Sequence, residues 1–198
     1  SRSQIKNTLE YIITALSKAK TNNLLISYFN TLTAMAKVSA LKHVEYLDKI
    51  IPLTIKYANL NFATNDSGDY DEKNELIEAA LNLQEAYLIK VADSLIKSIQ
   101  TIAKNSVDLL QYDPNYSYEN VVEEEDIDAG YDDYEYDAVV NMDDSSWKVR
   151  KAAVNVLNSL IKSGISIEKS LKEEIIQKLV KALREHDENT KYDIIKCL

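Results

Sequence analysis

Carboxylates are the residues of this sequence most able to do chemistry, because thirteen of them lie between Asp113 and Asp144. Carboxylate oxygens at this density could bind Ca²⁺. The stretch from Asp126 to Gly130 resembles the start of an EF-hand loop, which requires glycine at its sixth position. Gly130 falls at the fifth position, so the spacing fails and we predict no metal site.

Residues that could act as nucleophiles or general bases are few and scattered. His43 and His186 lie far apart, and each borders an expected helix, so we expect surface or helix-capping roles for both. Cys197 is the only cysteine and lies in an apolar helical stripe, which favours a place in the core. No glycine-rich phosphate loop, C-x₂-C pair or nucleophile elbow occurs. We therefore predict no catalytic, cofactor-binding or metal-binding residues, no small-molecule substrate and no enzymatic activity.

The charge of the chain is divided between two regions. No lysine or arginine lies between Asn105 and Trp147, and the formal net charge is −9, whereas the sequence outside that region carries +5. Like-charge repulsion favours a solvated, largely disordered loop over 113–143. A segment that docks on a basic partner surface is the alternative. An acidic chain repels phosphate, so we expect no nucleic-acid partner.

Apolar residues recur at helical spacing along the rest of the chain. Three glycines and two prolines are too few for a protein rich in β-turns. No apolar run approaches the ~18 residues of a membrane helix, so we expect no membrane partner. Pro52 is expected to bend its helix, and Gly164 to end one. We predict helices over 3–20, 24–39, 43–60, 71–91, 94–111, 145–163 and 167–185, with another beginning at 190.

These helices form pairs with a regular period. The first helices of two pairs start at 24 and 71, which are 47 residues apart, and the next starts at 145; removal of 113–143 leaves a spacing of 43 residues. Helix pairs repeating every ~40–47 residues are typical of HEAT and armadillo arrays, which stack into a solenoid. We predict an all-α HEAT-repeat solenoid with three parts. They are HEAT repeats over 1–112, the acidic loop over 113–143, and a HEAT repeat with the start of the next over 144–198.

The helix after the acidic stretch begins with a W-K-V-R-K-A-A motif over Trp147–Ala153. Its spacing predicts that Val149, Ala153 and Leu157 face the core. Trp147 is expected to be buried between repeats, with Asp144 or Ser145 capping the helix. Arg150 is expected to bind carbonyl groups or an acid of the adjacent repeat.

The motif resembles one family when it is taken with its surroundings. Tyr112–Asn115, then a long acidic stretch, then Asp143–Ala153, closely resembles the cullin-associated neddylation-dissociated proteins, a family of HEAT-repeat regulators. Three further stretches are similar to the same family, in order along the chain: Leu16–Lys18, Glu45–Leu53 and Leu183–Asn189. The tyrosines and valines mixed into the acidic stretch depart from the family pattern.

The resemblance implies a non-enzymatic scaffold, cytoplasmic and nuclear, that binds an unmodified cullin and its RING-box subunit. Such binding excludes neddylation and competes with the substrate-adaptor module, and it thereby controls ubiquitin ligase assembly. We expect this chain to be an internal segment of a longer protein. A HEAT scaffold of another kind, such as a transport receptor or a phosphatase scaffold subunit, is the alternative.

Overall fold

A computed structural model describes residues 2–64, 69–113, 145–185 and 187–198. The predicted acidic loop over 113–143 lies outside the described residues except for Asp113, and so does His186. The described residues form α-helices and short 3₁₀ segments without a strand. The α-helices are α1 (Arg2–Lys18), α2 (Asn22–Ser39), α3 (Leu47–Tyr57), α4 (Leu60–Thr64), α5 (Tyr70–Val91), α6 (Ile99–Leu109), α7 (Ser146–Ser163), α8 (Lys169–Lys181) and α9 (Glu188–Cys197).

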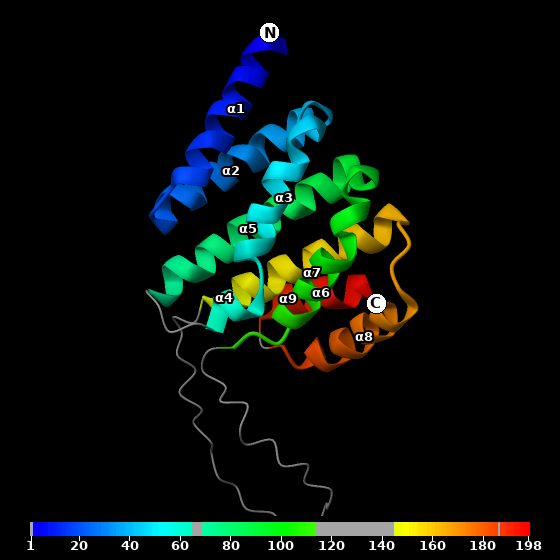
Figure 1. Ribbon diagram of the computed structural model, residues 1–198. Helices are drawn as coiled ribbons and strands as arrows, with labels where there is room; N and C mark the ends of the chain where they lie inside the picture. The colour runs from blue at the N-terminus through cyan, green and yellow to red at the C-terminus, as the bar shows by residue number, and fades with distance from the viewer. Residues whose placement is uncertain (1, 65–68, 114–144, 186) are drawn as a thin grey trace, which may run out of the picture.

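The helices stack in two layers (Figure 1). In the first layer, α5 packs between α2 and α7, and α9 packs against the other side of α7. In the second layer, α6 contacts both α3 and α8. Each connection from the first layer to the second stays within one helix pair, as in α2 followed by α3. The fold is therefore an all-α, HEAT-like solenoid, as the helical periodicity predicted.

The core runs continuously between the two layers because each inner helix buries more than one side. In α5, Leu76, Ile77 and Leu81 are all fully buried, since this helix contacts α2, α7 and α3 at once. A polar link crosses the layers inside this core, where the Gln84 amide donates to the Thr54 hydroxyl at 3.0 Å. Both side chains are completely buried, so α5 and α3 are held in one register by a hydrogen bond as well as by packing.

The second helices of the pairs are shorter and less regular than their apolar stripes predicted. The single helix expected over 43–60 is instead the 3₁₀ segment η2 (Val44–Tyr46), then α3, then α4. Pro52 is exposed inside α3, which continues past it to Tyr57. The joint between α3 and α4 is made by Asn59, whose amide donates to two carbonyls of α3 and accepts from the Phe62 amide. The break in this segment therefore lies at Asn59 and not at the proline.

The other two second-layer helices also have 3₁₀ ends. The expected helix over 94–111 begins in η3 (Ala92–Ser98) before α6, and the one over 167–185 ends in η5 (Ala182–Arg184) after α8. One more 3₁₀ segment, η1 (Ala40–Lys42), follows α2. Tight 3₁₀ turns are common where helices start and end.

One described stretch, Asn22–Lys42, is long and apolar enough by length and composition to cross a membrane. This corrects the expectation that no such run exists. In the fold this stretch is α2 with η1, and it contributes Leu25, Phe29 and Leu32 to the core. Core helices of soluble proteins pass the same test of length and hydropathy.

Candidate partner-binding groove

The first turn of α7 is tied to α5 by side chains. The Ser145 hydroxyl donates to Asp71 Oδ1 at 2.5 Å and accepts from the Asn74 amide at 2.9 Å. Ser145 holds the N-cap position, but its side chain makes no capping hydrogen bond to α7. The predicted cap is therefore wrong for Ser145, because its hydroxyl serves the neighbouring helix, and Asp144 lies outside the described residues.

Arg150, in α7, connects this helix to the residue after η5 and to the segment after α6. Its guanidinium binds the Glu185 carboxylate through two bonds, of 2.5 and 3.1 Å, and donates to the carbonyl of Tyr112 at 2.9 Å and the hydroxyl of Ser146 at 2.7 Å. The arginine and glutamate side chains are only 14% and 5% exposed. The Tyr112 carbonyl follows α6 of the preceding helix pair, which confirms the predicted carbonyl contact. The acid, Glu185, follows α8 and η5 of the same helix pair as Arg150, so it does not come from the adjacent repeat as the alternative expected.

The body of α7 is oriented by its apolar face. Val149, Ala153 and Leu157 are completely buried, as their spacing predicted. Gly164 ends the helix at φ 71°, in the left-handed region that glycine enters without steric cost, and this confirms its predicted role. With these positions fixed, the remaining side of α7 faces outward beside α5.

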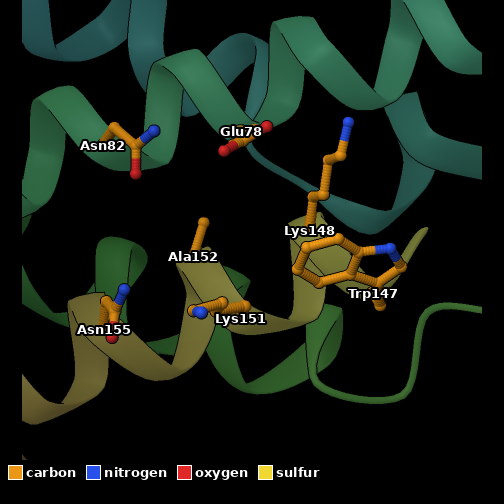
Figure 2. Close-up of a pocket in the computed structure, with 7 residues that line it drawn as sticks. All are labelled: Glu78, Asn82, Trp147, Lys148, Lys151, Ala152 and Asn155. Atoms are coloured by element: carbon orange, nitrogen blue, oxygen red, sulfur yellow. The ribbon is translucent and has the colours of Figure 1, made fainter. Parts of the chain in front are cut away.

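A groove lies between those two helices (Figure 2). Glu78 and Asn82 project into it from α5. Its volume is about 310 Å³. The side of α7 contributes Trp147, Lys148, Lys151, Ala152 and Asn155.

Trp147 is the largest side chain in this groove. It is half-buried, so the prediction of a tryptophan buried between repeats is wrong. Its position at the second residue of α7 places it beside the groove wall, while Ser146 takes the buried place next to Arg150. The Lys151 ammonium lies 6.0 Å from the centre of the indole ring and 4.0 Å from Asp193 Oδ2 on α9. The indole face is therefore bordered by a cation that a neighbouring acid holds in place.

The groove is suited to binding rather than to reaction. It combines a half-buried indole with two lysines, two asparagine amides and the carboxylate of Glu78, and it holds no histidine, cysteine or hydroxyl nucleophile. Within the described part of the chain, no group of three or more His, Cys, Asp or Glu residues could hold a metal ion. A tryptophan beside a small depression is typical of protein contact sites.

The described histidine lies in the core, which contradicts the expected surface or capping role. His43 is completely buried, and its Nδ1 lies 2.9 Å from the hydroxyl of Tyr87 on α5. Burial lowers the pKa of His43 to about 4 and raises the pKa of Tyr87 above its ordinary value. Cys197 is buried as predicted, and burial raises the pKa of its thiol to about 11, so this thiol is unreactive at neutral pH.

A second depression, of about 260 Å³, lies between α6 and α8. Its central cation, Lys104, is already paired with Glu174 at 2.6 Å and with Asp108 at 3.1 Å. The charge of Lys104 is therefore already balanced within the protein. The groove beside Trp147, which offers a large aromatic side chain, is the better candidate for binding a partner.

Comparison with known proteins gives matches over most of the chain. The chain is 25% identical over 193 residues to cullin-associated NEDD8-dissociated protein 1 of Drosophila melanogaster, which covers 94% of this chain and 14% of that protein. It is 24% identical over 191 residues to the Arabidopsis thaliana protein of the same name, which covers 96% and 15%. The similarity supports a distant relationship to this family.

Protein 2 of the same family, from Rattus norvegicus, is 28% identical over 152 residues, which covers 75% of this chain and 11% of that protein. The chain thus spans only about a seventh of the length of the first two relatives. No protein-family model matches the chain.

Proposed function

We propose that this chain is one segment of a non-enzymatic HEAT scaffold that binds unneddylated cullin–RING-box complexes in the cytoplasm and nucleus. In this role the whole protein controls the assembly of cullin–RING ubiquitin ligases and the exchange of their substrate adaptors. The segment contributes part of an extended binding surface and catalyses nothing.

The observation that carries the proposal is the extent of the similarity. Relatives named for cullin association match 94% and 96% of the chain, so the likeness spans all the helix pairs and is not confined to one motif. The stacked fold is also suited to the role, because a solenoid presents a long continuous surface built from neighbouring repeats.

The α5–α7 groove supplies a place on this segment where such a partner would bind. Trp147 offers a large anchor that needs little conformational ordering, and tryptophan is enriched at the energetic centres of protein interfaces. Lys148 flanks the anchor and favours an acidic residue on the partner. Because one groove is a small part of a distributed interface, the segment alone should bind weakly.

The test is binding to a matched pair of cullin–RING-box complexes, with and without the NEDD8 modifier, measured by surface plasmon resonance. We expect the unmodified complex to bind the whole protein and the modified one to bind at least about tenfold more weakly. Equal binding to both complexes, or to neither, would refute the proposal and leave a HEAT scaffold with another partner.

Two variants of the whole protein, measured in the same binding experiment, test whether the groove is part of the interface. Trp147→Ala should increase the dissociation rate more than it slows association, because most interface changes act on dissociation. Ile176→Ala on α8 is the control, since Ile176 is also exposed and apolar but lies outside the groove. If both variants dissociate at the wild-type rate, the groove is not part of the interface.

A further inference from the structure

The last turns of α2, α5 and α7 each expose one large apolar residue. Val38, Ile89 and Ile161 are 89%, 59% and 50% exposed. Each lies one or two residues before its helix ends. Single exposed apolar residues are common on protein surfaces. Here the same helix position exposes one in each of three consecutive repeats.

A lysine accompanies every one of these residues. Lys37 precedes Val38, Lys90 follows Ile89 and Lys162 follows Ile161. A lysine near a helix C-terminus is favoured by the helix dipole, which accounts for the cations but not for their apolar neighbours. We call these six residues the helix-end row.

Stacking of the first-layer helices places the helix-end row along one edge of the molecule. The C-terminal ends of α2, α5 and α7 follow one another on the right-hand side of Figure 1. Neighbouring packed helices are separated by about 8–10 Å, so the row repeats an apolar residue and a cation at about that interval.

The 3₁₀ segments that leave these ends continue the same chemistry. Leu41 with Lys42 in η1, and Ile96 with Lys97 in η3, are again exposed apolar–lysine neighbours. Leu41 is 80% and Ile96 58% exposed. Asp93 is an exposed carboxylate in η3, so cations outnumber carboxylates along this edge.

The three lysines of the row are free to pair with a partner. Among the described residues, none of Lys37, Lys90 and Lys162 forms an ion pair. Their ammonium groups are therefore available to the carboxylates of a partner.

We propose that the helix-end row is a docking surface for an acidic amphipathic helix of a partner protein. Residues seven apart on an α-helix are separated by about 10 Å along one face, which matches the spacing of the row. Apolar residues at i, i+7 and i+14 would contact Val38, Ile89 and Ile161 in turn. Carboxylates beside them would pair with Lys37, Lys90 and Lys162. This surface lies apart from the α5–α7 groove and does not depend on the partner being a cullin.

The test uses a fluorescein-labelled synthetic peptide of about 18 residues, helical by design, with leucine at i, i+7 and i+14 and glutamate beside each leucine. Binding to the full chain is measured by fluorescence anisotropy. A scrambled peptide of equal composition and charge is the first control. We expect the designed peptide to bind at least about tenfold more tightly than the scrambled one, and binding to weaken as salt is raised.

Two triple variants locate the binding. Val38→Ser, Ile89→Ser and Ile161→Ser together remove the apolar contacts, and Lys37→Glu, Lys90→Glu and Lys162→Glu together reverse the charge. Each set should weaken binding about tenfold or more. All six positions are exposed, and circular dichroism verifies that every variant keeps its helices.

Matched controls separate this surface from general charge and hydrophobicity. Lys169→Glu, Lys172→Glu and Lys181→Glu change the net charge equally at exposed positions of α8. Ile176→Ser, Val180→Ser and Ile195→Ser remove three exposed apolar groups elsewhere. Both controls should bind like the wild type.

Three outcomes would overturn the proposal. They are no binding of the designed peptide, equal binding of the scrambled peptide, and equal losses in the control variants. Vesicles containing phosphatidylserine are tested in parallel. If they bind the chain and the designed peptide does not, the edge contacts a membrane surface instead.

Discussion

Residues His43 and Arg150 both place an ionisable side chain inside the protein. The histidine is neutral there, whereas the arginine is charged and paired. His43 is held neutral, because burial disfavours its charged form and its Nε2 atom has no hydrogen-bond partner. Arg150 keeps its charge, because the Glu185 carboxylate and two neutral oxygens satisfy its donors. The two sites should therefore respond differently to pH and to substitution.

Acidification should destabilise the protein through His43. Its pKa is about 4 in the fold and 6.5 when unperturbed, so the unfolded chain binds the proton first as pH falls. The stabilisation is fully present above pH 6.5 and is lost as pH falls from about 6.5 to 4, on the order of 3 kcal/mol in total. Urea denaturation at several pH values across this window measures the loss.

His43→Gln is the informative variant for this pH dependence, since the glutamine amide can form hydrogen bonds but does not titrate. Stability of this variant should vary less with pH across the same window. His186→Gln is the matched control, because it removes the other histidine. An unchanged pH slope in His43→Gln would contradict the assignment.

Substitution of Arg150 should be among the most damaging single changes in α7. Arg150→Ala leaves the Glu185 carboxylate buried without its partner, which costs about 3–5 kcal/mol. Arg150→Lys keeps the charge but cannot reproduce the two-bond fork, so it should also destabilise, by less. Chemical denaturation of Arg184→Ala, an exposed arginine in η5, gives the control value near zero. Equal stability of the Ala variants would show that the pair contributes nothing.

At the scale of elements, the first-layer helices are straightforward to predict and the second-layer helices are not. The ends of α2, α5 and α7 agree with their apolar stripes to within about two residues, because each helix buries a continuous face. Short 3₁₀ segments bury apolar residues at nearly the same spacing as an α-helix. The apolar stripe over 43–60 therefore could not show where one helix ends and the next begins.

Irregular and terminal parts of helices also explain why the predicted positions of two side chains, His43 and Trp147, were wrong. His43 sits between η1 and η2, where no helical period indicates which side chains point inward. Trp147 follows directly after the start of α7, and there its neighbour Ser146 occupies the buried position, where its hydroxyl accepts a hydrogen bond from Arg150. The groove combines residues of α5 and α7 that are far apart in sequence, so only the packing of the repeats could reveal it.

The end of α7 offers a test of backbone conformation free of packing effects. Gly164 has φ +71°, and a Cβ added there would meet no atom within 4 Å. Gly164→Ala should therefore destabilise through strain alone, by about 1–2 kcal/mol. Gly164→Asn should cost less, since asparagine tolerates this region better. Thermal unfolding compares the three proteins; an alanine variant as stable as the wild type would show that the turn can rearrange.

At the scale of the whole molecule, stability should fall from the middle of the stack toward its ends. α5 packs against first-layer neighbours on both sides, whereas α1 and α9 each have a neighbour on one side within the described chain. In a solenoid, stability is approximately the sum of repeat and neighbour terms. Hydrogen exchange measured by mass spectrometry should show slowest exchange in α5 and α7 and fastest in α1 and α9. Uniform protection would indicate a single cooperative unit.

Arg150 and Tyr112 also make this chain a suitable host for a grafted domain. The arginine holds the Tyr112 carbonyl at 2.9 Å, so the scaffold itself fixes the distance between the points where the chain leaves and rejoins it. The closure cost of a flexible insert grows by only about 0.6 kcal/mol for each doubling of its length. A reporter protein whose own termini lie close together could therefore be spliced in after Asp113 without displacing α7.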